Sequence, residues 1–113
     1  MATFHFMVFS NPVDGREDDF NTWYDKEHLE DLLAIDGFKA AQRYRLAALG
    51  PGQDEPTYRY AAVYEAEGDD AAGLQQKLMD ALTSGRVRPP NGIAPGALAA
   101  WFEPIGERRI APS

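Results

Sequence analysis

The order of strand-like and helix-like segments is the feature that most constrains this chain. Short runs rich in β-branched and aromatic residues indicate strands, and apolar residues spaced three and four apart indicate helices. Along the 113 residues these patterns follow one another as β-α-β-β-α-β. The segments cover, in chain order, residues 3–9, 17–35, 38–49, 57–66, 69–83 and 98–105.

This order is that of the split β-α-β arrangement, also called ferredoxin-like. It predicts an α+β domain over residues 1–106, with a four-stranded antiparallel sheet, two helices on one face, and a C-terminal tail over residues 107–113. The other sheet face would carry bulky and apolar side chains, which water solvates poorly. A second copy of the chain is the simplest cover, so we expect a homodimer whose two sheets form a dimeric α/β barrel.

Composition excludes several classes of partner. The net charge of −7 argues against nucleic acid and against an anionic membrane surface. The absence of cysteine excludes disulfides and thiolate metal sites. No apolar run reaches the roughly 18 residues that span a bilayer, and the N-terminus has no secretory pattern, so we expect a cytoplasmic protein.

Strand alternation predicts how the second strand presents its side chains. It places Phe38, Tyr44 and the even-numbered residues between them on one face, and Arg43 and Arg45 on the other. We expect the two arginines to pair with Glu65 at the barrel face. The proline-rich stretch 86–95 appears loosely specified by its sequence.

The first helix contains the most informative candidate residue, His28. At about 100° per residue, His28 falls in the middle of the buried stripe, four residues after Tyr24 and four before Leu32. A buried histidine needs partners for its ring nitrogens. A core histidine would find them in a backbone carbonyl, Glu27 or Asp31. A functional histidine would find them in a ligand, and the spacing leaves both interpretations open.

The remaining polar candidates lie on strands. His5 shares a strand face with Met7 and Phe9, and this face looks either toward the helices, beside His28, or toward a partner subunit. Tyr44 is the best candidate to send a hydroxyl group into a pocket, followed by the pair on the third strand, Tyr60 and Tyr64.

Several signatures of cofactor and metal chemistry are missing. The chain has no glycine-rich phosphate loop, no G-x-S-x-G turn and no H-E-x-x-H zinc motif, so we expect no cofactor and no metal. The simplest remaining chemistry is proton transfer, with His28 as general base or acid because its ordinary pKa lies near neutral pH. A tyrosine hydroxyl would orient a carbonyl or enolate oxygen.

The segment DDFNTWYDKEHLEDLLAIDGFKAAQRYRL resembles the EthD-like and related branches of the dimeric α/β-barrel superfamily. It contains the W-x-x-x-x-H-L core at Trp23–Leu29, a turn at Asp36-Gly37, and a strand with Arg43-Tyr44. The superfamily includes polyketide cyclases, cofactor-free monooxygenases, muconolactone isomerase and haem-handling enzymes. This chain departs from the haem-handling branches because its second helix has no histidine.

The resemblance implies a small-molecule pocket between the first helix and the sheet, lined by Trp23, Tyr24 and His28. His5 is similar to a strand-one pocket histidine of plant-type polyketide cyclases. We therefore expect a cofactor-free cyclase, isomerase or lyase that acts on a small apolar oxygenated or aromatic compound. The expected catalytic residues are His28, His5 and Tyr44, and the expected substrate-binding residues are Phe20, Trp23, Tyr24, Met7, Phe9, Tyr60 and Tyr64.

Two alternatives remain open from the sequence. A cofactor-free monooxygenase of the same fold would use Trp23 and His28 to handle an activated phenol and oxygen. A non-catalytic ligand-binding dimer would keep His28 as a satisfied core residue.

Overall fold

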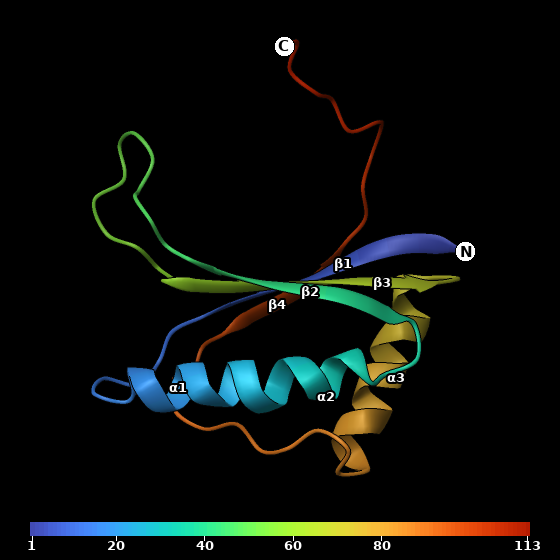
Figure 1. Cartoon of the computed structure of the whole chain (residues 1–113), viewed down its shortest axis with the longest axis horizontal. Coiled ribbons are helices and arrows are strands. Elements are labelled where there is room, and N and C mark those ends of the chain that lie inside the picture. Colours follow the sequence, from blue (N-terminus) through green and yellow to red (C-terminus); the bar gives the residue numbers. More distant parts are fainter.

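Four antiparallel strands form one sheet in the order β2-β3-β1-β4 (Figure 1). A computed structural model describes all 113 residues. The elements are β1 (Ala2–Ser10), α1 (Glu17–Trp23), η1 (Tyr24–His28), α2 (Leu29–Leu33), β2 (Phe38–Arg45), β3 (Tyr60–Gly68), α3 (Ala71–Thr83) and β4 (Leu98–Phe102). This confirms the predicted α+β class and the β-α-β-β-α-β order, in which α1, η1 and α2 form the first helix.

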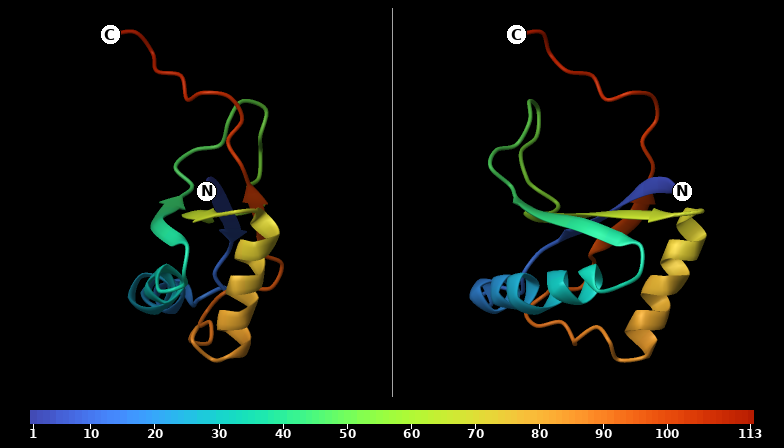
Figure 2. Two further views of the ribbon diagram at one scale, coloured as in Figure 1. Left: turned by 90° about the vertical axis from the view of Figure 1, so that its right-hand side faces the viewer. Right: turned by 45° about the vertical axis from the view of Figure 1, so that its right-hand side comes forward.

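Both helices cover the same face of the sheet, as Figure 2 shows from two sides. Strand alternation sends Phe4, Phe6 and the buried hydroxyl residue Ser10 of β1 toward the helices. In β3 the inward residues include Tyr60 and Tyr64. The core therefore lies between the helices and this inner face. None of the helices has the length and apolar character needed to cross a membrane.

A bulge in β2 changes the predicted faces of that strand. Phe38 lies opposite Ala66, but Ala40 lies opposite Glu65, so the register shifts by one residue between them. Phe38 remains buried, whereas Tyr44 moves to the outer face and Arg43 to the inner face. The predicted face assignment was wrong because one extra residue reverses the alternation of every residue after it.

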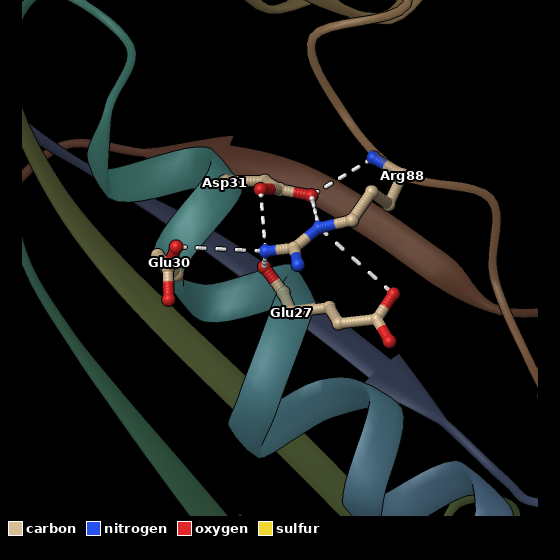
Figure 3. A network of polar contacts seen from close by, with 4 residues as sticks. All are labelled: Glu27, Glu30, Asp31 and Arg88. Atoms are coloured by element: carbon tan, nitrogen blue, oxygen red, sulfur yellow. Dashed lines mark hydrogen bonds and ion pairs between the residues drawn. The ribbon is translucent and has the colours of Figure 1, made fainter.

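The proline-rich stretch between α3 and β4 has no helix or strand but is firmly anchored, so its description as loosely specified was wrong. Arg88 binds Asp31 through its backbone N–H (2.8 Å), its Nε (3.0 Å) and its Nη2 (2.9 Å) (Figure 3). Its Nη2 also donates to the Glu27 carbonyl and lies 3.6 Å from a Glu30 carboxylate oxygen. These contacts join the stretch to the end of the first helix, 57 residues earlier in the chain.

The same stretch also packs against the beginning of α1. The Val13 amide donates to the Gly92 carbonyl at 2.8 Å, and Ala94 donates to Asn11 at the same distance. Gly92 has a φ of +80° and lies so close to the helix that a Cβ would stand 2.9 Å from the Phe20 nitrogen. Only glycine satisfies both the left-handed backbone and this close approach.

We expect Gly92→Ala to destabilise the protein by about 1–3 kcal/mol more than Gly15→Ala, because only the former adds an overlap with helix backbone. Gly15 is a matched control, since its φ is also +80° and a Cβ there would meet nothing within 4 Å. Urea unfolding of the two variants measures the difference. Equal stability would mean that the stretch does not hold α1 at Gly92.

Candidate functional site

The first helix contains a π-helical turn at its centre. The Leu29 amide, which follows η1, donates to the Tyr24 carbonyl five residues back, instead of four as in an α-helix. Residues 17–35 were expected to form one regular α-helix, and this turn was not predicted. Single π turns within α-helices are rare and occur frequently at functional sites.

The π turn brings two rings together that a regular helix would separate. Residues five apart in an α-helix point about 140° away from each other. Here the rings of Trp23 and His28 lie 4.5 Å apart, with an angle of 31° between their planes. Tyr24 completes the group, edge-on to the imidazole at 5.1 Å. His28 is half-buried rather than at the centre of a buried stripe, and its ring packs on Trp23 and Tyr24.

Three buried polar atoms near this turn lack a hydrogen-bond partner in the protein: Trp23 Nε1, His28 Nδ1 and the Tyr64 hydroxyl. Trp23 is 4% exposed and Tyr64 is fully buried. The Tyr64 hydroxyl faces that of Tyr24 without meeting hydrogen-bond geometry. Leaving a buried polar atom unpaired costs about 1–3 kcal/mol. We call Trp23, Tyr24, His28 and Tyr64 the π-turn site, because Tyr24 contacts or faces each of the other three.

Burial keeps the ionisable groups of the π-turn site neutral. It lowers the pKa of His28 to about 4, although the Asp31 carboxylate acts in the opposite direction. Burial thus moves the His28 pKa away from the ordinary, near-neutral value on which its expected role as general base or acid rested. Burial also raises the pKa values of Tyr24 and Tyr64, an effect that the nearby Arg43 opposes. At neutral pH the site thus presents an uncharged imidazole and two intact phenols.

Arg43 lies on the helix side of the sheet, contrary to the prediction that it pairs with Glu65. Its guanidinium stacks over the Tyr24 ring at 4.5 Å and donates to Asn21 at 2.8 Å and Asp25 at 2.9 Å. The β2 bulge explains the difference, because it moves Arg43 to the inner face. Glu65 instead lies 3.7 Å from His5 on the outer face.

The structure divides the predicted site residues between the two faces of the sheet. Phe20, Tyr60 and the π-turn site lie on the inner face, where Phe20 packs edge-on against both Tyr24 and Tyr60. The Tyr60 hydroxyl donates to Glu17. On the outer face lie His5, Met7, Phe9 and Tyr44. One subunit therefore does not gather His5, Tyr44 and His28 around one cavity.

The outer-face group surrounds a hollow of its own. This hollow measures about 300 Å³ and is lined by His5, Tyr44 and Glu65 among other residues. Tyr44 is 55% exposed and lies opposite Ala61, on the face of the sheet away from the helices. Strand parity explains the separation, because successive residues of β1 face opposite sides and the neighbours of His5, Phe4 and Phe6, face the helices.

The π-turn site itself is packed and borders no principal hollow of the surface. The hollow that comes nearest to it measures about 250 Å³ and is lined by Asn21, Asp25, Arg43, Tyr44, Arg45 and Tyr60. Arg43 belongs to this hollow and to the packing of Tyr24 at once. No three His, Asp or Glu side chains are grouped as ligands for a metal ion.

Comparison with solved structures identifies the fold. An EthD-like protein from Ralstonia eutropha JMP134 superposes with a TM-score of 0.63 over 96% of each chain, at 17% identity. An ethyl tert-butyl ether D (EthD) family protein from Bacillus halodurans C-125 gives a TM-score of 0.55 at 17% identity, covering 93% of this chain and 100% of that one. The fold is EthD-like. No family model matches the sequence, and no curated protein matches it.

The EthD-like fold thus agrees with the resemblance carried by Trp23–Leu29, while three features of the site were missed. These are the π turn, the inward position of Arg43, and the pairing of Asp31 with Arg88. Asp31 was considered as a partner for His28, but its hydrogen bonds go to Arg88, which lowers the pKa of the Asp31 carboxyl group.

The lowered pKa of His28 predicts a specific loss of stability in mild acid. Between pH 6.5 and about 4, the unfolded chain binds a proton at His28 that the folded chain does not, so the free energy of unfolding falls as the pH falls. The full effect is up to about 3 kcal/mol and is absent above pH 6.5. Urea unfolding across this window should give a shallower pH dependence for His28→Gln. Identical slopes for the two proteins would mean that His28 titrates normally.

Proposed function

We propose that this protein binds a small, largely apolar oxygenated or aromatic compound at the π-turn site and acts on it by cofactor-free acid/base chemistry, as a cyclase, isomerase or lyase. The observation that carries the proposal is the group of three buried, unpaired polar atoms around Tyr24. A ligand oxygen that paired with them would recover the free energy that their burial costs. The aromatic rings of Trp23 and Tyr24 would contact its apolar part.

The proposed reaction removes a proton from a ligand carbon next to a carbonyl group, with His28 Nδ1 as the base and Trp23 Nε1 and the Tyr64 hydroxyl as hydrogen-bond donors. A neutral His28 accepts the proton at Nδ1 when its own proton is on Nε2. The ligand becomes an enolate, whose negative charge favours the imidazolium form and so raises the His28 pKa in the complex. The Trp23 N–H and the Tyr64 hydroxyl would donate to the enolate oxygen.

A non-catalytic ligand-binding function is the second candidate, and the low pKa of His28 favours it. A general base works best when its pKa lies near the operating pH. At a pKa of about 4 the free imidazole is a weak base, but it remains a good hydrogen-bond acceptor.

Hydrogen–deuterium exchange at carbon separates the two functions without knowledge of the natural substrate. We expect the protein to catalyse exchange of the α-protons in members of a panel of small aromatic ketones in D₂O, followed by NMR. His28→Gln should lower the exchange rate by about 10²-fold or more, because it removes the base.

Tyr64→Phe should also slow the exchange, whereas Tyr58→Phe should not, because the Tyr58 hydroxyl donates to the Gly96 carbonyl away from the π-turn site.

Ligand binding is measured separately, from the NMR shift of the Trp23 indole resonance. Binding without exchange would select the non-catalytic function. No shift of Trp23 and no exchange across the panel would reject both.

We also propose that the protein forms a homodimer through the outer face of the sheet. Exposed Tyr44, Leu98 and Phe102 make this face apolar. The β2–β3 connection and the C-terminal stretch after β4 both extend to this side of the sheet (Figure 1). Ile105 and Ile110 of that stretch are largely exposed within one subunit. A second copy on this face would cover all of these side chains.

Analytical ultracentrifugation should give twice the chain mass of 12.5 kDa. Leu98→Glu should shift the protein to monomer, because it places a charge in the covered face. Leu82→Glu is the matched control, since Leu82 is similarly exposed but lies on α3. Monomeric wild-type protein, or equal effects of the two variants, would contradict this interface.

A further inference from the structure

The hollow beside the β2 edge is a positively charged site in an acidic protein. Two arginines, Arg43 and Arg45, line it together with one carboxylate, Asp25, whereas the whole chain has a net charge of −7. Its volume of about 250 Å³ approaches the size of sites for small molecules. Asp25 offsets one of the two positive charges, so the lining keeps a net positive charge that favours anionic ligands.

Arg43 is held firmly but has hydrogen-bonding capacity left over. Its side chain is 14% exposed, and the stacking on Tyr24 fixes the plane of the guanidinium. Asn21 and Asp25 engage two of its N–H groups, and its other N–H donors meet no acceptor in the protein. Arg45 makes no hydrogen bond or ion pair through its side chain. The planar guanidinium of Arg43 therefore has free N–H donors, and the unpaired Arg45 lies beside it. Together they match a carboxylate in shape and charge.

The position of Arg43 connects this hollow to the π-turn site. Its guanidinium lies on one face of Tyr24, and the same ring contacts Trp23 and His28. An anionic group bound at Arg43 would therefore lie on the far side of the guanidinium from Tyr24, next to the π-turn site. We propose that the ligand carries a carboxylate, which binds Arg43 and Arg45 in this hollow. This inference rests on the proposed function, because it specifies the chemical class of the compound bound there.

Asp25 acts as an internal competitor in this arrangement. Its carboxylate is 56% exposed and bonds to Arg43 through one oxygen, so water screens the pair and it is weak. A ligand carboxylate competes with Asp25 for the guanidinium, or is repelled by it. Removal of the Asp25 charge should therefore strengthen binding, which a purely structural role of Arg43 would not predict.

Benzoate and benzamide test the proposal, because they share one shape and differ in charge. Isothermal titration calorimetry on the wild-type protein should show benzoate binding about tenfold more tightly than benzamide. Arg43→Gln should remove this preference, and Arg43→Lys should keep only part of it, because an ammonium group lacks the planar fork. Asp25→Asn should tighten benzoate binding several-fold and leave benzamide unchanged.

Arg86→Gln is the control for a general loss of positive charge, since Arg86 lies at the end of α3 and bonds to Ser84. If Arg43→Gln fails to fold, Arg45→Gln and Asp25→Asn still test the proposal, with weaker and tighter benzoate binding expected. The proposal is overturned if neither compound binds at millimolar concentration, if benzamide equals benzoate, or if Asp25→Asn weakens benzoate binding.

NMR of the Trp23 indole separates this inference from the proposed function. Benzoate binding that depends on Arg43 but leaves Trp23 and His28 unshifted would support the anion site and reject the π-turn site. Benzamide and benzoate that shift Trp23 equally, with no effect of Arg43→Gln, would support the π-turn site and overturn the anion site.

Discussion

The π turn in the first helix is the constraint on which the candidate site depends. A helix of regular geometry would separate Trp23 from His28, whereas the wider turn stacks their rings. This stacking contributes favourable aromatic contact, but it also removes the polar edge of each ring from water. The burial that packs the two rings is therefore the same burial that keeps His28 neutral and leaves Nδ1 unpaired.

A second single-residue irregularity, the bulge in β2, determines the charge beside that site. The register shift after Phe38 sends Arg43 inward onto Tyr24 and Tyr44 outward onto the open face. Without the bulge, the guanidinium would point away from the helices. The Tyr44 phenol would then occupy that position, and no positively charged group would contact the Tyr24 ring. One extra residue in the helix and one in the strand thus bring an imidazole, an indole, two phenols and a guanidinium close together.

The two irregularities also explain how far the sequence could predict this protein. Periods of 2 and 3.6 residues were enough to obtain the order of the elements and the placing of Tyr60 and Tyr64 on one face of a strand. Neither a bulge nor a π turn has a local sequence signal of its own, and each moves the following side chains to another face. The anchoring of Arg88 on Asp31 joins residues 57 positions apart, so a reading of local patterns could not find it.

The unpaired atoms of the π-turn site set the cost of keeping this arrangement in the free protein. Trp23 Nε1 and His28 Nδ1 would cost about 1–3 kcal/mol each, which is a substantial share of the 5–15 kcal/mol by which small domains are stable. Packing alone would be better served by phenylalanine at Tyr64 and by an apolar side chain at His28, which would bury the same surface without this cost. The proposed ligand would recover this cost by pairing with these atoms. Arg43 links these atoms to the 250 Å³ hollow, because its guanidinium stacks on the Tyr24 ring and lines that hollow at once.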